Sequence, residues 1–156
     1  EDRHFEPEIQ VPLKCEINSA YIEDPKLRLS LYRKISLCKE EPQLEFIYQE
    51  ILDRFGEVPP ETQNLFWVIR IRNLLKRIGI ESLTVQSNKT VLTVKKQSQI
   101  NLDEVMKLYV GPKNLRDSRL SLTPDSKILL NIEFVSLQAH LFELQALFSK
   151  IAPNIV

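Results

Sequence analysis

The chain has 156 residues, of which 43% are hydrophobic and 27% charged, with 21 basic side chains balancing 21 acidic ones. This length and composition are typical of one globular domain and exclude a disordered tail, and zero net charge argues against a general polyanion-binding protein. Charge is nevertheless divided, since residues 1–60 carry 8 basic and 13 acidic side chains and residues 61–156 carry 13 basic and 8 acidic.

Apolar and other side chains alternate loosely over residues 7–18, where the apolar positions are Ile9, Val11, Leu13, Cys15 and Ile17. A period of two predicts a β-strand, and Pro12 on the opposite side favours a sheet edge. An extended linker explains the pattern nearly as well. Residues 1–18 are therefore predicted to be a linker or edge strand that leads from a parent protein.

Three helices are predicted next, joined by turns that contain Pro and Gly. The spacing of apolar residues predicts them over 24–37, 42–55 and 60–78. Asp24-Pro25 supplies an N-cap side chain and a Pro at the first helical position. Gly56 and Gly79 stand where the second and third helices should end. The helical part of the chain is thus expected to span residues 24–79.

From residue 81 the apolar period changes to two, and turn residues separate the short runs. Two hairpins are predicted, one with strands 83–86 and 90–94 and one with strands 120–122 and 128–132. Helices should follow them over 102–109 and 135–151. Two ββα units over 81–151 predict an α+β fold: a small antiparallel sheet of two hairpins with helices packed on one face. One domain should span 19–156.

Residues that could support catalysis or bind a metal are few. All three glycines lie at predicted helix ends, so no phosphate-binding loop is indicated. His4 is expected in a flexible end, and His140 with Glu143 forms a single i, i+3 pair, which a surface hydrogen bond explains better than a metal site. We therefore expect no catalytic residue, no cofactor and no metal, and the chain is predicted not to be an enzyme.

The cysteines and the apolar runs indicate a compartment. Cys15 and Cys38 form no CxxC pair, so reduced thiols in a cytoplasmic protein are expected. No apolar run approaches the roughly 20 residues that cross a bilayer, and the N-terminus has no secretory signal, so no membrane contact is expected. The chain lacks an initiator Met, which hints at a fragment of a longer protein.

Two charged helix faces are candidates for binding. A basic stripe on the third predicted helix could contact nucleic acid through Arg70, Arg72, Lys76 and Arg77. Zero net charge and the lack of interleaved aromatics favour a solvated or internally paired face instead. On the second helix Glu50 and Asp53 lie one turn apart, opposite the apolar residues. Such a pair is typical of an ordinary solvated face, and it is also what arginines of a partner would bind.

The acidic pair belongs to a string that resembles a known family. Residues 50–56 read Glu-Ile-Leu-Asp-Arg-Phe-Gly, and together with Val58-Pro59 and Asn64-Leu65 they resemble the C-terminal domain of bacterial transcription-repair coupling factor (Mfd). The resemblance covers about residues 9–80 and includes the predicted first and third helices. Glu23 departs from it, because the family often has Pro there, and this affects only the turn into the helix.

The resemblance implies a regulatory domain of a much larger protein. The family's full-length protein is an ATP-driven DNA translocase that rescues stalled RNA polymerase and recruits nucleotide-excision repair, and its motor motifs are absent here. In the family this domain clamps onto an N-terminal module that resembles UvrB and covers the surface that UvrA must reach. Carried onto this sequence, the acidic clamp residues are Glu50 and Asp53, with Arg54 beside them. The alternative function is a DNA-contacting module that uses the basic stripe.

Overall fold

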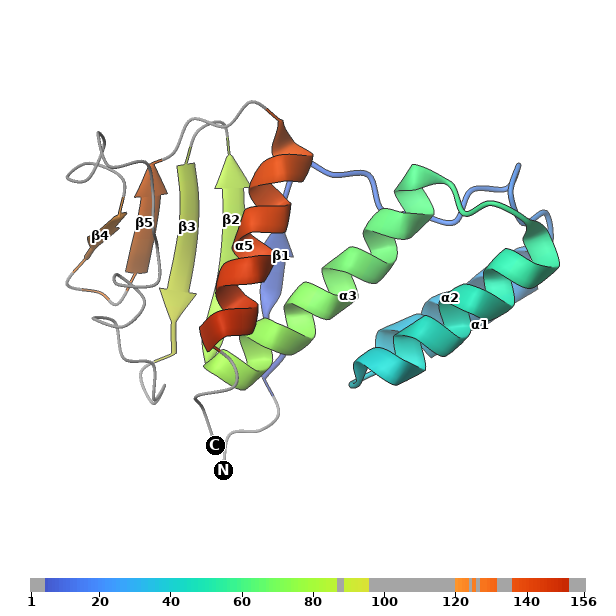
Figure 1. The fold of residues 1–156 in the computed structure, drawn as a ribbon, viewed down its shortest axis with the longest axis horizontal. Helices are drawn as coiled ribbons and strands as arrows, with labels where there is room; N and C mark the ends of the chain where they lie inside the picture. The colour runs from blue at the N-terminus through green and yellow to red at the C-terminus, as the bar shows by residue number, and fades with distance from the viewer. Residues whose placement is uncertain are drawn as a thin grey trace. The chain divides into compact units, whose positions relative to one another are not determined.

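The computed structural model describes residues 5–86, 89–95, 120–123, 125, 127–131 and 136–151. Along the chain, Figure 1 shows β1 (Glu8–Gln10), α1 (Pro25–Leu37), α2 (Glu41–Phe55), α3 (Pro60–Ile78), β2 (Ile80–Gln86), β3 (Lys89–Val94), β4 (Leu120–Leu122), β5 (Lys127–Asn131) and α5 (Leu137–Ile151). The chain divides into two compact units, Leu13–Asn73 and Glu1–Pro12 with Leu74–Val156. The predicted division into a leading segment 1–18 and one domain 19–156 stays a prediction.

The ends of the first two helices follow from local chemistry, as predicted. The Asp24 carboxylate accepts a hydrogen bond of 2.9 Å from the backbone N–H of Lys26, and Pro25 occupies the first turn of α1. At the start of α2, the Gln43 side-chain oxygen accepts from the N–H groups of Lys39 and Glu40 at 3.0 and 3.2 Å. Gly56 ends α2 with φ of +83°, which a residue with a Cβ rarely adopts.

The first unit, Leu13–Asn73, is built around one hydrophobic core. Each of its helices contributes buried residues to this core, which are Leu31, Ile35, Leu44, Ile47, Ile51, Phe66 and Ile69, and the connecting segments add Ile17, Ile22, Cys38 and Val58. Burial of one such large side chain stabilises a fold by about 1.5–3 kcal/mol. The three helices therefore depend on one another, and the predicted helices 24–37, 42–55 and 60–78 are confirmed to within a residue or two.

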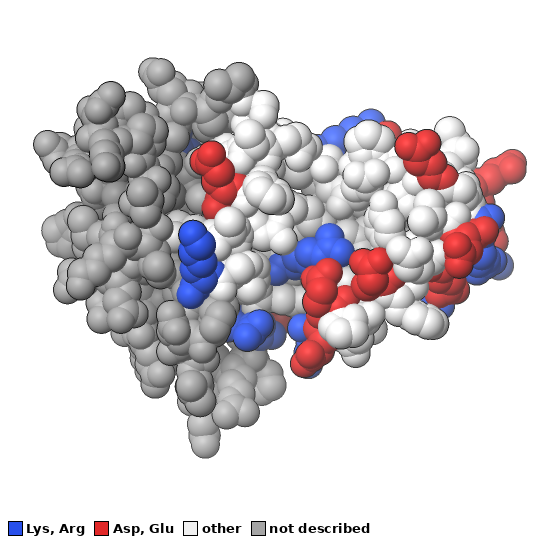
Figure 2. Space-filling view, viewed as in Figure 1, with Lys and Arg blue, Asp and Glu red and all other residues white. Residues whose placement is uncertain are grey.

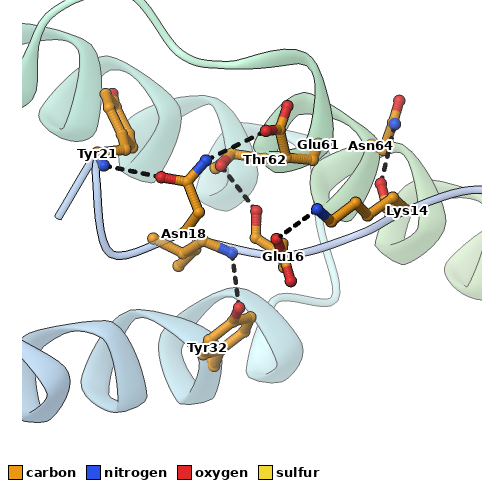
Figure 3. A network of polar contacts seen from close by, with 9 residues as sticks. Lys14, Glu16, Asn18, Tyr21, Tyr32, Glu61, Thr62 and Asn64 are labelled. Atoms are coloured by element: carbon orange, nitrogen blue, oxygen red, sulfur yellow. Dashed lines mark hydrogen bonds and ion pairs between the residues drawn. The ribbon is translucent and has the colours of Figure 1, made fainter.

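The segment 13–18 lies beside α1 and α3 and is held there by side chains (Figure 3). Tyr32 of α1 accepts a hydrogen bond of 2.6 Å from the backbone N–H of Ile17, and Thr62 of α3 donates one of 2.9 Å to the Glu16 carbonyl. The predicted strand 7–18 is therefore wrong over most of its length. In this part of the chain only Glu8–Gln10 is a strand, because backbone groups of residues 14–17 bond to α1 and α3 rather than to a neighbouring strand.

The second unit contains a five-stranded sheet with the order β1-β2-β3-β5-β4. Both predicted hairpins are confirmed, since β2 pairs antiparallel with β3 and β4 antiparallel with β5. β1 pairs parallel with β2 at the edge, so the sheet is mixed rather than purely antiparallel as predicted. The edge position that Pro12 indicated for this strand is correct. The sequence pattern could not show the direction of pairing, because alternation is the same in both kinds of ladder.

Helix α5 covers one face of this sheet (Figure 1) and confirms the predicted layering. Leu141, Leu144 and Phe148 are buried residues of α5, and Leu83, Leu92 and Ile128 are buried residues of three neighbouring strands. A hydrogen bond of 2.7 Å joins the Thr90 hydroxyl of β3 to the His140 ring of α5. The predicted helix 102–109 lies outside the described residues.

Candidate protein-binding site

The acidic pair lies on α2, away from the apolar face of that helix. Ile47 and Ile51 are buried in the core of the first unit, whereas the Asp53 side chain is exposed and that of Glu50 is about one-third exposed, at 33%. A spacing of three residues in a helix places two side chains on the same side, one turn apart. The two predicted residues are thus brought together at the surface, with Glu50 less exposed than expected.

The two carboxylates differ in their contacts. One Glu50 oxygen lies 3.8 Å from an Arg54 guanidinium nitrogen, within an i, i+4 pair in which the Arg54 side chain is 54% exposed. An ion pair this long and this exposed contributes roughly 0–1 kcal/mol, so an incoming guanidinium could replace it at small cost. Asp53 makes no hydrogen bond or ion pair with any residue that the structure describes. Within the described residues, the acidic pair is therefore only weakly neutralised.

The end of α2 is held in place by the segment that precedes α1. The Tyr21 hydroxyl donates a hydrogen bond of 2.8 Å to the Gly56 carbonyl, and its ring meets Phe55 edge to face at a centroid distance of 6.1 Å. The Arg54 guanidinium lies 5.0 Å from the centre of the Phe55 ring. Burial raises the pKa of the Tyr21 hydroxyl, which therefore keeps its proton as a donor. Asp53 and Arg54 accordingly project from a supported helix end.

The predicted basic stripe is not one free cationic surface. The Arg70 Nε donates to both carboxylate oxygens of Glu41, at 2.7 and 2.9 Å. Arg72 donates to the Ser36 carbonyl at 2.7 Å. These two arginines connect α3 to α1 and α2 inside the first unit, and Figure 2 shows acidic side chains lying beside basic ones over these helices.

The other two cations of the stripe belong to the second unit. Lys76 donates to a Glu6 carboxylate oxygen at 2.9 Å, whereas Arg77 is exposed and has no ion-pair partner in the described part of the chain. Sequence spacing missed Glu41, Ser36 and Glu6 as partners of the stripe, because each lies at least 29 residues away along the chain. No local pattern indicates such pairs.

The structure also bears on the histidine, the cysteines and the metal and membrane predictions. The prediction of a surface hydrogen bond between His140 and Glu143 is wrong: His140 is 2% exposed and bonds Thr90, while Glu143 is exposed. Cys15 and Cys38 are free thiols, as predicted. The described residues contain no cluster of three metal-binding side chains, and none of their helices is both long and apolar enough to cross a membrane.

Comparison with known proteins places this geometry in a family. The model of the TRCF domain matches residues 11–105, more than half of the chain. This chain belongs to the TRCF domain family. The resemblance seen in residues 50–56 is thereby confirmed, and α2 with its acidic pair lies inside the matched part of the TRCF domain.

The relatives of this TRCF domain carry a common name. Transcription-repair-coupling factor of Rickettsia conorii is 30% identical over 128 residues, which cover 82% of this chain and 11% of the relative. The protein of that name from Escherichia coli is 29% identical over 94 residues, which cover 60% of this chain and 8% of the relative. The chain thus spans about a tenth of the length of these relatives.

A solved structure confirms the fold class. The C-terminal domain of a transcription-repair coupling factor superposes with a TM-score of 0.81 over 97% of this chain and 94% of that chain, at 17% sequence identity. The α+β fold of the TRCF domain is therefore shared with that domain, over the helical and the sheet parts alike. Identity this low supports the fold and says nothing of individual side chains.

Proposed function

We propose that this TRCF domain is a non-catalytic regulatory domain, which binds an N-terminal UvrB-like module of its own full-length protein and masks the UvrA-binding surface of that module. The observation that carries the proposal is the weakly neutralised pair of Glu50 and Asp53 on a helix inside the matched family region. Two carboxylates one turn apart can accept bidentate, charge-assisted hydrogen bonds from arginines of a partner.

The strength of the contact suits a regulated clamp. Domains that share one chain meet at an effective concentration of about millimolar, so a weak contact is enough to keep them together. Only a few kcal/mol would then oppose opening, and a ligand that prefers the open state can supply that difference. Glu50 is already loosely paired with Arg54, so exchange between the two guanidinium partners would cost little.

The full-length protein is proposed to be an ATP-driven DNA translocase of the cytoplasm that acts with RNA polymerase and DNA. The names of the relatives, which join transcription to repair, support the part of this proposal that links the protein to transcription and DNA repair. Masking of the UvrA-binding surface until the translocase engages polymerase would restrict repair to stalled transcription. The regulatory domain itself would contribute binding and no chemistry.

Charge reversal in the full-length protein tests the clamp. Glu50→Arg combined with Asp53→Arg replaces two acceptors with two cations, so the clamp should open and the affinity for UvrA should rise about tenfold, a typical allosteric coupling. Titration of UvrA by fluorescence anisotropy or calorimetry measures the change. Glu81→Arg with Glu143→Arg is the matched control, because both residues are exposed in the second unit and change the net charge equally. Unchanged UvrA affinity in the first double variant would remove these residues from the mechanism.

A DNA-contacting role for the basic stripe receives less support. Arg70 and Lys76 are engaged by acidic side chains of the same unit, and Arg72 by a backbone carbonyl. Phosphate binding would have to break these contacts, whereas Asp53 has none to break within the described residues. The protein-binding function is therefore the one that the geometry favours.

A further inference from the structure

An open apolar groove of about 550 Å³ lies in the first unit, between the end of α1 and the start of α2. It is lined by the apolar residues Leu37, Cys38, Pro42, Phe46 and Ile47 and by two polar residues, Lys34 and Gln43. We call this surface the α1–α2 groove. Its volume lies in the range of pockets that accept small ligands or a few large side chains of a peptide.

Two apolar residues that line the α1–α2 groove are unusually exposed to solvent. The side chains of Leu37 and Phe46 are 74% and 73% exposed, which makes them two of the four large hydrophobic residues most open to solvent in the described chain. Single exposed apolar residues are common, but two that face one groove form a patch of the kind that marks an interaction site. Neither residue supports the core, so folding does not explain them.

The α1–α2 groove is preformed. Cys38, in its wall, donates its thiol to the Lys34 carbonyl at 3.2 Å, and its own carbonyl accepts from the Asn73 side chain at 3.0 Å. Gln43 is fixed by the two hydrogen bonds from Lys39 and Glu40 that start α2. A binding surface whose backbone is already ordered loses little entropy when a ligand arrives.

Charge distinguishes this groove from the acidic pair. Lys34 is the one charged side chain of the lining, it is exposed, and no acidic residue of the described chain pairs with its ammonium group. Arg70 and Lys76, by contrast, have acidic partners. An apolar groove with a cation in its lining that no described carboxylate neutralises is complementary to an apolar group with a neighbouring carboxylate.

We propose that the α1–α2 groove binds a short helical segment of another protein, in which a large apolar side chain lies about one turn from a carboxylate. Helices that enter grooves use apolar anchors at such spacings, and Phe46 and Leu37 would contact the anchor while Lys34 pairs with the carboxylate. This goes beyond the proposed clamp, because Glu50 and Asp53 attract guanidinium groups and Lys34 repels them.

A designed peptide tests the groove on the 156-residue chain. The probe is a fluorescein-labelled helical peptide of about 14 residues, with Leu and Phe four apart and Glu on the same face, and the matched peptide carries Lys in place of Glu. Anisotropy titrations should show about twofold to fivefold preference for the Glu peptide, as expected for one exposed ion pair. In Lys34→Glu the preference should invert, which a structural role of Lys34 would not produce.

Substitution of Phe46, which would contact the apolar anchor of the peptide, provides the second test. Phe46→Ser should weaken binding of the Glu peptide at least about tenfold, as truncation of a central apolar contact does. Phe142→Ser is the matched control, since Phe142 is 72% exposed on α5 in the second unit and should leave binding unchanged. Both residues are exposed, so both variants should keep the wild-type circular dichroism melt.

Three outcomes would overturn the proposal. The Glu peptide fails to bind, or Phe46→Ser and Phe142→Ser behave alike, or the Lys34→Glu chain keeps the wild-type preference. Concentration-dependent self-association that Phe46→Ser abolishes would assign the groove to a second copy of this chain and likewise contradict the proposal. Analytical ultracentrifugation of the chain without peptide distinguishes that case.

Discussion

At the scale of single residues, His140 is buried, whereas the sequence predicted a position at the surface. It is 2% exposed on α5, and its Nε2 lies 2.7 Å from the Thr90 hydroxyl of β3. Burial lowers the pKa of His140 because the protonated ring loses its hydration, and the nearby Glu143 offsets this only in part. The neutral ring is therefore the form that the fold favours.

A dependence of stability on pH follows from that lowered pKa. In the unfolded chain the His140 ring takes up a proton near its ordinary pKa of about 6.5, whereas in the folded chain it does so only at lower pH. Stability should be full above about pH 6.5 and should fall as the pH drops from there towards the folded pKa. Thermal melts between pH 5 and pH 8 measure this, and His140→Gln should have a shallower slope in that window. Equal slopes for the two proteins would show that His140 is not responsible.

At the scale of elements, α2 carries two surfaces with opposite chemistry. Its first turns form a wall of the α1–α2 groove through Pro42 and Phe46, and its last turns carry Glu50 and Asp53. Both surfaces depend on the same buried face, because Leu44, Ile47 and Ile51 fix the rotation of the helix about its axis. The segment 13–18 fixes α1 and α3 in turn through its hydrogen bonds to Tyr32 and Thr62 (Figure 3).

Loss of one of those hydrogen bonds should destabilise the first unit. Tyr32→Phe removes the acceptor of the Ile17 N–H group in a partly buried hydrogen bond, so the loss should be about 1 kcal/mol, at the lower end of the range for an unsatisfied buried donor. Urea unfolding monitored by circular dichroism measures the loss. Tyr48→Phe is the matched control, because the Tyr48 hydroxyl has no hydrogen bond to any described residue, and it should change stability by less than about 0.5 kcal/mol. Similar losses in both variants would contradict the role given to segment 13–18.

At the scale of the whole molecule, charge is balanced, and part of the basic stripe is paired within the chain. The 21 basic and 21 acidic side chains sum to zero, and two of the four cations of the basic stripe are held by acidic side chains. A surface that binds DNA needs cations that phosphates can neutralise with release of counterions. The described surface therefore suits binding to a protein better than binding to nucleic acid.

Duplex DNA is accordingly expected to bind very weakly. Titration of a labelled duplex with the 156-residue chain at low and near-physiological salt should show no measurable binding at the higher salt, because Arg70, Arg72 and Lys76 of the basic stripe already make contacts that phosphates would have to replace. Arg77→Ala should then have no effect on the titration. A steep salt dependence with detectable affinity near physiological salt would instead promote the DNA-contacting alternative.

Local chemistry in the sequence was enough to predict most elements. Asp24-Pro25 predicted the start of α1, Gly56 the end of α2, and alternating residues around short turns predicted both hairpins. These features depend on neighbours along the chain, so their physics is readable from sequence. The family string at residues 50–56 added the membership that the comparisons confirm.

Tertiary structure decided what depends on residues distant in sequence. Three features depend on partners 29 or more residues away along the chain. They are the pairing of Arg70 with Glu41, the burial of His140 against Thr90, and the parallel pairing of β1 with β2. Helical spacing shows that Leu37 and Phe46 lie near apolar positions of their own helices, but only the packing of α1 beside α2 leaves both exposed around one groove. Periodicity sets which side chains share a face, and only packing determines what that face meets.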